Sequence, residues 1–501
     1  MRHQPVKRIL GVLLMVFSLF MLPPLLVSWY YGITQSGEPI TIALLLVGDG
    51  GANAFLLSFG IILALGLAIW FPARGKRKGA DLKIRDGFLV VSAFWLGLGM
   101  AGAVPLFIST QPALTITDAV FESISGLTTT GATVLTGLDQ LPRSILFYRQ
   151  QLQWLGGMGI IVLAVAVLPM LGIGGMQLYR AETPGPMKDS KLTPRITETA
   201  KALWYIYLGL TIACSLAYWG AGMSPFDAVC HAFSTIAIGG YSTHDASMGY
   251  FDNTLIEMIA VVFLLISGAN FALHFTAWRG KNPWVYFADS EFRFYLLIQL
   301  GAAFFVMLAL YFTGSYHDLW EAVTLGLFQA VSIGTTAGFT TADYSIWPGF
   351  IAITLLFTSF MGGCAGSTGG GIKAIRFLLL IKQGLREINR LIHPNAQIPI
   401  RIGSKSIEPR VVEAVWGFFA LYVASFTFMY IALAMTGLNL MTAFSAVAAS
   451  INNLGPGLAD VALNYGDIND PAKWILCFAM LLGRLEIFTL LVLLTPAFWR
   501  K

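Results

Sequence analysis

Long apolar stretches, each bounded by short polar segments, make up most of this chain of 501 residues. A run of roughly 17–25 apolar residues is long enough to cross a bilayer as a helix. Ten runs reach that length, at about 9–31, 41–72, 87–109, 147–173, 201–220, 255–278, 294–313, 349–380, 411–436 and 472–499. The pattern therefore predicts an all-α polytopic membrane protein with ten spanning helices.

The first run follows a basic segment containing Arg2, Lys7 and Arg8, and could be interpreted as a secretory signal peptide. It continues to Tyr31 without a clear small-residue cleavage site, so a retained first helix is the favoured interpretation. The longest polar segment, 381–410, is predicted to be a loop, and no linker indicates a second domain.

Four shorter apolar segments lie between the predicted spans and are too short to cross, at 117–127, 225–235, 318–333 and 439–450. Each is followed by a glycine turn, and the four glycines, Gly131, Gly240, Gly338 and Gly455, recur at intervals of 109, 98 and 117 residues. Such segments must enter the membrane and return, which is tolerated only inside protein or beside water.

The repeated unit is therefore helix, half-helix, turn and helix, present four times in the same orientation after two N-terminal helices. We expect these four parallel helix–pore-loop–helix repeats to surround a central pore. The expected division of the chain is 1–80 for the N-terminal helices and their basic loop, then 81–180, 181–280, 281–400 and 401–501 for the four repeats.

This arrangement favours cations. Half-helices that end near the membrane centre direct the negative ends of their dipoles at the axis, and backbone carbonyls at the turns can replace an ion's hydration shell. Outward-facing acids could add attraction or simply cap helices: Asp118, Glu122, Asp227, Asp318, Glu321, Asp343 and Asp460.

Composition supports the membrane assignment and charge sets the orientation. The chain is 56% hydrophobic and 11% charged, against about 25% charged in soluble domains. If the N-terminus is cytoplasmic, the segments predicted to be cytoplasmic contain 27 of the 31 lysines and arginines, as the positive-inside rule requires. Both termini are then cytoplasmic. The net charge of +5 reflects topology, and nucleic-acid binding is not expected.

Other chemistry finds little support in the sequence. The four cysteines and six histidines show no metal-ligand spacing, and hydrolase, zincin and P-loop motifs are absent. An intramembrane enzyme would need His, Asp or Glu within the spanning helices, which offer almost none. A secondary transporter for an organic solute would usually have inverted repeats, whereas these repeats are parallel.

The motifs T-T-T-G-A-T, A-I-G-G-Y-S-T-H, T-T-A-G-F-T and N-N-L-G-P-G resemble the four filter segments of the Trk/Ktr/HKT superfamily of potassium transporters. The two N-terminal helices and R-L-I-H-P-N-A at 390–396 are similar to its TrkH/TrkG branch. The resemblance implies potassium bound by filter carbonyls of Thr129, Thr130, Gly131, Ile238, Gly239, Gly240, Thr336, Ala337, Gly338, Asn453, Leu454 and Gly455.

The same resemblance implies a homodimer in the bacterial inner membrane, with a cytosolic, nucleotide-binding regulatory subunit of the TrkA type. No cofactor is expected in this chain, and K⁺ is the bound substrate. An all-glycine filter goes with potassium in this superfamily. The second and fourth motifs depart from a T-x-G pattern at Ile238–Gly239 and Asn453–Leu454, so a sodium or mixed-cation transporter stays an alternative.

Two features interrupt the symmetry of the repeats. Arg484 lies near the middle of the last predicted span, where a charge costs roughly 2.5–3.5 kcal/mol on insertion scales. The resemblance implies that it is a pore barrier, with a structural ion pair as the alternative. The eighth predicted span contains a glycine-rich segment, and the resemblance implies a gating loop made of Gly362, Gly363, Gly366, Ser367, Thr368, Gly369, Gly370 and Gly371.

Overall fold

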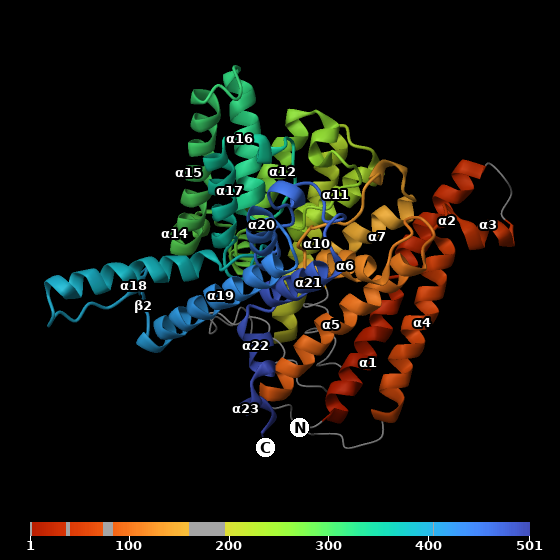
Figure 1. Cartoon of the computed structure of the whole chain (residues 1–501), viewed down its shortest axis with the longest axis horizontal. Coiled ribbons are helices and arrows are strands. Elements are labelled where there is room, and N and C mark those ends of the chain that lie inside the picture. The colour runs from red at the N-terminus through yellow and green to blue at the C-terminus, as the bar shows by residue number, and fades with distance from the viewer. Residues whose placement is uncertain (1–2, 37–40, 74–83, 160–195, 404, 501) are drawn as a thin grey trace.

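The computed structural model describes residues 3–36, 41–73, 84–159, 196–403 and 405–500. Within these ranges the chain is almost entirely helical, as the hydrophobic pattern predicts (Figure 1). Strands β1 (Arg401–Ile402) and β2 (Lys405–Ser406) pair as a short antiparallel hairpin, with Arg401 opposite Ser406.

The N-terminal part consists of α1 (His3–Leu19), α2 (Leu22–Ser36), α3 (Ile42–Val47) and α4 (Ala52–Trp70). α1 packs closely against α4. A β-carbon on Gly11 would lie only 2.8 Å from the Gly66 carbonyl oxygen, so a larger residue would not fit there. Small residues of this kind allow apolar helices to approach each other within a membrane. These helices form one side of the molecule, coloured red in Figure 1.

Four groups of helices follow, each with a long helix, then a short helix that ends at a glycine turn, and then a further helix after the turn. The first contains α5 (Ile84–Ile108), α6 (Ile116–Leu127) and α7 (Arg143–Trp154), and α7 continues as one π-helical turn, Leu155–Gly159. The second contains α10 (Ile196–Gly220), α11 (Pro225–Ala237), α12 (Thr254–Ser267) and α13 (Phe271–Gly280).

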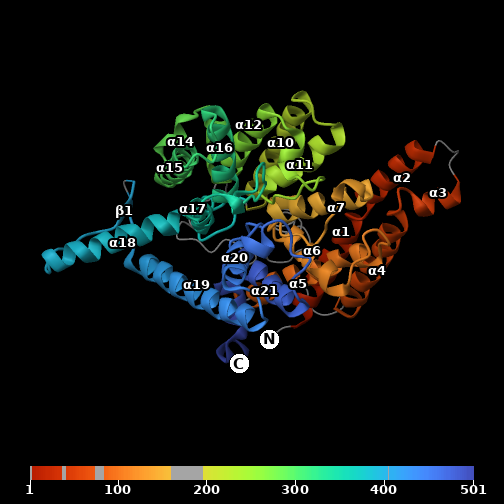
Figure 2. The same ribbon diagram turned by 45° about the horizontal axis from the view of Figure 1, so that its top comes forward.

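The third group contains α14 (Trp284–Ala288), α15 (Ser290–Phe312), α16 (Leu319–Gly334), α17 (Gly349–Met361) and α18 (Ala374–Ile392). The fourth contains α19 (Pro409–Met435), α20 (Leu440–Ile451), α21 (Asp470–Arg484), α22 (Phe488–Leu494) and α23 (Pro496–Trp499). We call these groups the first to fourth repeats. Figure 2 shows them around a middle that is occupied by the loops after the short helices.

The four short helices α6, α11, α16 and α20 begin in the same way. A side-chain oxygen of Thr115, Ser224, Asp318 or Asn439 accepts a backbone N–H from the first turn of its helix. Such caps satisfy amide groups that a helix leaves without an internal partner. Capping residues in the sequence thus determine where each half-helix starts.

The structure has fewer uninterrupted spans than the ten predicted. Among the described residues, six helices are long and apolar enough to cross a membrane, or up to eight if two bent pairs each count as one span. The predicted span 147–173 continues beyond the described residues, and 349–380 is interrupted between Met361 and Ala374. The predicted run 41–72 is two helices, α3 and α4, separated at Gly48–Gly51.

The two bent pairs correct the predicted spans 255–278 and 472–499. α12 and α13 meet at 93°, where Asn270 caps a new helix by accepting the backbone N–H of Ala272. α21 and α22 meet at 119°, and the two residues before α22, Glu486 and Ile487, both have positive φ. Left-handed backbone of this kind ends a helix, so each of these two predicted spans is a bent pair of helices and not one straight helix.

The predicted loop 381–410 is also wrong in part. α18 continues to Ile392, and the β1–β2 hairpin follows before α19. Apolar residues recur at Ile381, Leu385 and Ile388, the spacing of one helix face. α1 begins and α23 ends on the same side of the molecule (Figures 1 and 2).

Candidate ion-binding site

The four glycine turns have the same backbone conformation. The glycines Gly131, Gly240, Gly338 and Gly455 have φ values of 83°, 79°, 82° and 97°. The residues two positions earlier also have positive φ: Thr129 at 55°, Ile238 at 53°, Thr336 at 73° and Asn453 at 53°. Positive φ is unfavourable for a β-branched residue such as Ile238, and four such positions in register indicate a shared functional constraint.

The four turns close into a ring. A β-carbon on Gly131 would lie 2.1 Å from the Gly239 carbonyl oxygen, and one on Gly240 would lie 1.9 Å from that of Ala337. We call the residues of the four turns, 129–131, 238–240, 336–338 and 453–455, the glycine ring. It closes in chain order. A β-carbon on Gly338 would lie 2.1 Å from the Leu454 carbonyl oxygen, and one on Gly455 would lie 2.7 Å from the Thr130 carbonyl oxygen.

Each short helix ends with the same hydrogen bond. The amide before each ring glycine donates at 2.8 Å to a carbonyl five residues earlier, from Thr130 to Ser125, Gly239 to Ser234, Ala337 to Ser332 and Leu454 to Ala449. This is a common way to close a helix C-terminus. The bond uses the backbone oxygen, so an alanine in the fourth repeat serves as well as the three serines.

Side chains join neighbouring parts of the glycine ring. Asn453 Nδ2 donates to Thr130 Oγ1 at 3.0 Å and to the Met480 carbonyl at 3.0 Å, which links the fourth turn to the first. Between the first and second turns, Gln153 Nε2 donates to the Gly239 carbonyl at 2.6 Å. These residues are buried, and the ring is thus held from behind.

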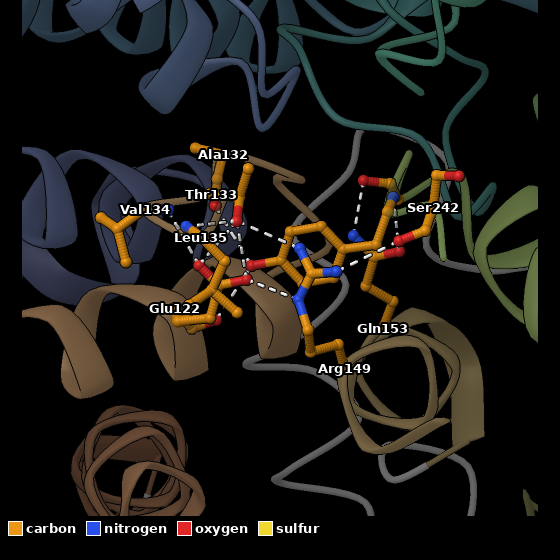
Figure 3. A network of polar contacts seen from close by, with 10 residues as sticks. Glu122, Ala132, Thr133, Val134, Leu135, Arg149, Gln153 and Ser242 are labelled. Atoms are coloured by element: carbon orange, nitrogen blue, oxygen red, sulfur yellow. Dashed lines mark hydrogen bonds and ion pairs between the residues drawn. The ribbon is translucent and has the colours of Figure 1, made fainter. Parts of the chain in front are cut away.

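A buried ion pair lies behind the first two turns (Figure 3). Arg149 Nε lies 2.8 Å from Glu122 Oε1, and Arg149 also donates to Thr133 Oγ1 at 3.0 Å and to the Ser242 carbonyl at 3.1 Å. The guanidinium carbon is 4.2 Å from the centroid of the Tyr241 ring. Breaking a buried pair leaves one charge uncompensated, so this network constrains both turns.

Two of the outward-facing acids are paired with cationic side chains, and a third caps a helix. Glu122 is paired with Arg149, and Asp118 is 2.7 Å from Lys473 Nζ. A carboxylate with a cationic partner at this distance has much of its charge neutralised. Asp318 instead caps α16, the other role that the sequence allowed.

An outer cluster joins the first and second repeats. His244 Nδ1 contacts Asp139, and His244 Nε2 is 3.5 Å from Asp227 Oδ1. Burial lowers the pKa of His244, but hydrogen bonds to Asp227 and Asp139 outweigh it and raise the pKa above the ordinary value. Burial raises the pKa of Asp139, but the hydrogen bond to His244 outweighs it and lowers that pKa.

The glycine-rich segment Gly362–Lys373, which we call the intramembrane loop, lies against the glycine ring. Gly370 N donates to Thr336 Oγ1 at 2.7 Å, and Gly371 N donates to the Asn452 carbonyl at 3.0 Å. A β-carbon on Gly370 would lie 1.9 Å from that same carbonyl oxygen. The break in the helix is thus observed, and glycine is required for this close approach.

Further hydrogen bonds hold the rest of the intramembrane loop. Thr368 Oγ1 donates to the Ile236 carbonyl at 2.9 Å, and Cys364 N donates to the Gly268 carbonyl at 2.8 Å. Glu291 Oε1 accepts from Ala365 N at 2.6 Å and from Ile375 N at 3.2 Å. The loop therefore packs into the break between α12 and α13.

Arg484 reaches the glycine ring and the intramembrane loop together. Nη1 donates to Thr129 Oγ1 at 3.1 Å and to the Thr368 carbonyl at 3.2 Å, and Nη2 donates to the carbonyls of Gly156 at 2.5 Å and Gly157 at 2.8 Å. Arg484 is the last residue of α21, so its expected place in mid-helix is wrong. Neutral oxygens surround it in these contacts, while the neighbouring Glu486 is paired with Arg376.

Sequence reasoning treated Arg484 as the notable charge at membrane depth and missed several others. Arg149 lies within the predicted span 147–173, and Lys373 and Arg376 lie within 349–380. Arg149 and Lys373 are buried, and Lys373 Nζ donates to the Gly369 carbonyl. All three lie within predicted spans, but Arg149 is followed by Gln150 and Gln151 and is not inside an apolar run, so the signal that singled out Arg484 was weaker for it.

Comparisons with known proteins identify the relatives of this chain. The model of the TrkH family, described as cation transport protein, matches residues 51–501. The chain is 57% identical over 503 residues to the Trk system potassium uptake protein TrkH of Vibrio parahaemolyticus and 53% identical over 501 residues to that of Escherichia coli, covering 100% of each chain in both cases.

Among solved structures, the crystal structure of the potassium transporter TrkH from Vibrio parahaemolyticus superposes with a TM-score of 0.88 at 54% identity. It covers 100% of both chains. The Trk system potassium uptake protein TrkG of Escherichia coli is 43% identical and matches 99% of this chain and 98% of its own length.

Proposed function

This chain belongs to the TrkH family of cation transport proteins, and we propose that it carries potassium ions into the cell through the glycine ring. K⁺ is the transported substrate of the family. Its relatives in Vibrio parahaemolyticus and Escherichia coli are named potassium uptake proteins, which supports this assignment.

The observation that carries the proposal is the closure of four turns into one ring, with each ring glycine facing a carbonyl of the next repeat. A ring of carbonyls can replace the water around a cation. The short helices α6, α11, α16 and α20 all end at the ring, so their negative dipole ends add to its attraction for cations.

The proposed potassium-binding groups are backbone carbonyls of the glycine ring. They belong to Thr129, Thr130, Gly131, Ile238, Gly239, Gly240, Thr336, Ala337, Gly338, Asn453, Leu454 and Gly455.

Flux into proteoliposomes tests the proposal. The purified protein should accumulate rubidium or potassium, and external potassium should compete with rubidium far better than sodium or choline. Equal competition by sodium would favour the alternative of a mixed-cation transporter, for which the departures at Ile238–Gly239 and Asn453–Leu454 are the supporting observation. Competition by an organic cation would instead support the last alternative, a secondary transporter for an organic solute.

The intramembrane loop and Arg484 are the proposed gate. The gate residues in the loop are Gly362, Gly363, Gly366, Ser367, Thr368, Gly369, Gly370 and Gly371. Their support is the direct contact of Gly370 with Thr336 and of Arg484 with both Thr129 and Thr368. Deletion of residues 364–370 in a variant that still folds should change the rate of ion flux. An unchanged flux would contradict the proposal that the loop is a gate.

The same proposal includes the location of the protein, its topology and its partners. It is a multi-pass protein of the bacterial inner membrane with both termini cytoplasmic, and it forms a homodimer controlled by a cytosolic TrkA-like nucleotide-binding subunit. The division into 1–80, 81–180, 181–280, 281–400 and 401–501 is part of this proposal. Co-purification with a TrkA-like subunit, and cross-linking of two copies, are the direct tests.

A further inference from the structure

The second turn of the glycine ring differs from the others in the residue before its glycine. That residue is Gly239, whereas the equivalent residues are Thr130, Ala337 and Leu454. Two successive glycines have the widest choice of backbone conformations. Gly239–Gly240 is therefore the part of the ring that its own side chains hold least.

Gln153 occupies the space that a side chain at position 239 would need. A β-carbon on Gly239 would lie 2.4 Å from the carboxamide carbon of Gln153. Gln153 is fully buried and comes from α7 of the first repeat. The residues 22 positions after the other ring glycines, as Gln153 is after Gly131, are Val262, Phe360 and Cys477, none of which has an amide.

The Gln153 carboxamide holds the backbone on both sides of Gly240. Nε2 donates to the Gly239 carbonyl at 2.6 Å, and Oε1 accepts from Tyr241 N at 3.1 Å. The orientation of the amide follows from this pair, because the backbone N–H of Tyr241 can only donate. The Gly239 carbonyl has a second lone pair, so it can still face an ion.

The buried network of Figure 3 lies next to Gln153 along α7. Arg149 lies one turn earlier on α7, and it contacts the Tyr241 ring and the Ser242 carbonyl. Residues four apart share a helix face. One face of α7 thus contacts Gly239, Tyr241 and Ser242.

We propose that Gln153 is a positioning residue for ion selectivity, which takes the place of a side chain at Gly239 and keeps the Gly239–Gly240 carbonyls directed at the ion. The inference rests on the proposed potassium transport through the glycine ring. Without Gln153, the two glycines can rotate their shared peptide plane, and the ring loses the fixed set of carbonyls that distinguishes potassium from sodium.

The test measures the ratio of potassium to sodium flux in proteoliposomes. Gln153→Met fills a similar volume and removes both hydrogen bonds. The ratio should fall by about five- to tenfold, the scale of the one lost hydrogen bond that acts on a ring carbonyl, that of Gly239. The matched control is Gln150→Met on the same helix, because Gln150 is equally buried and its carboxamide has no hydrogen-bond partner among the described residues. The control should keep the original ratio.

A compensating pair gives the second, independent readout. Gly239→Ala alone should lower the ratio, because the new methyl group collides with Gln153. Gln153→Ala together with Gly239→Ala should bring the ratio back to within about twofold of the unaltered protein, since the methyl group enters the vacated space and the turn then matches Ala337–Gly338. Gly239 does not have a positive φ, so alanine is tolerated there.

The outcomes separate this inference from the proposed function. If the unaltered protein shows no preference for potassium, the proposed function fails. If it is selective and folded Gln153→Met is equally selective, or if the compensating pair is no more selective than Gly239→Ala, the role of Gln153 is wrong. Should Gln153→Met yield no folded protein, the comparison of Gly239→Ala with the compensating pair decides.

Discussion

Replacing Arg484 tests whether the proposed gate acts through charge or through hydrogen bonds. The guanidinium donates to Thr129 Oγ1 and to the Thr368 carbonyl, as well as to two carbonyls after α7. Arg484→Gln removes the charge and keeps an amide donor. Arg484→Lys keeps the charge and loses the planar fork that reaches several acceptors.

The structure indicates the size of the charge effect. Nη1 is 3.1 Å from Thr129 Oγ1, so an ion that touches this hydroxyl would lie on the order of 6 Å from the guanidinium. Two unit charges at that separation repel by about 3 kcal/mol at an effective dielectric constant of about 20. Such a barrier lowers the rate of passage about a hundredfold.

The assay is rubidium uptake into proteoliposomes at equal protein density, with the fraction of folded protein checked by gel filtration. If the charge is the barrier, Arg484→Gln raises uptake by up to about a hundredfold, and Arg484→Lys stays close to the unaltered rate. If hydrogen bonds to the loop hold the gate closed, both variants raise uptake. An unchanged rate for Arg484→Gln would refute both forms of the barrier.

Three further predictions concern the ring and its surroundings. Gly240→Ala should abolish selective flux, because its β-carbon would lie 1.9 Å from a carbonyl oxygen of the next repeat and φ is +79° there; ion competition measures this. Glu122→Gln should lower stability in detergent by about 3–5 kcal/mol by leaving Arg149 uncompensated, as measured by thermal unfolding. Because the pKa of His244 is raised, its pairing with Asp139 stabilises the folded protein fully at a pH below the ordinary pKa of histidine, and this stabilisation weakens as pH rises through the raised pKa. His244→Gln should therefore flatten the dependence of melting temperature on pH between about pH 5 and about pH 8.

Matched controls accompany these variants. Gly209→Ala lies on α10, where a β-carbon would meet nothing within 4 Å, and it should leave selectivity intact. Glu321→Gln changes an exposed carboxylate and should leave the melting temperature within about 2 °C. His317 is exposed and is not part of the outer cluster, so His317→Gln is the control for the pH dependence. An equal loss in variant and control would contradict the corresponding prediction.

The hydrophobic pattern predicted the helical membrane fold and the four repeats well. Apolar length and glycine spacing are local properties of a chain, and the capping residues Thr115, Ser224, Asp318 and Asn439 mark the half-helices directly. The breaks after α12 and α21 were missed, because apolar length alone does not report backbone angle, although Ser267, Gly268 and Asn270 stand inside the run 255–278 where the first break lies.

The sequence by itself determined the membrane class, the number and order of the repeats and the family resemblance, because repeated turns and apolar runs are encoded in short segments. Only the tertiary structure decided which carbonyl faces which glycine, that Arg484 ends α21 and touches both Thr129 and Thr368, and that Gln153 fills the space beside Gly239. Those contacts join residues from different repeats, some more than 300 positions apart. Their partners depend on how the helices pack, which no local pattern specifies.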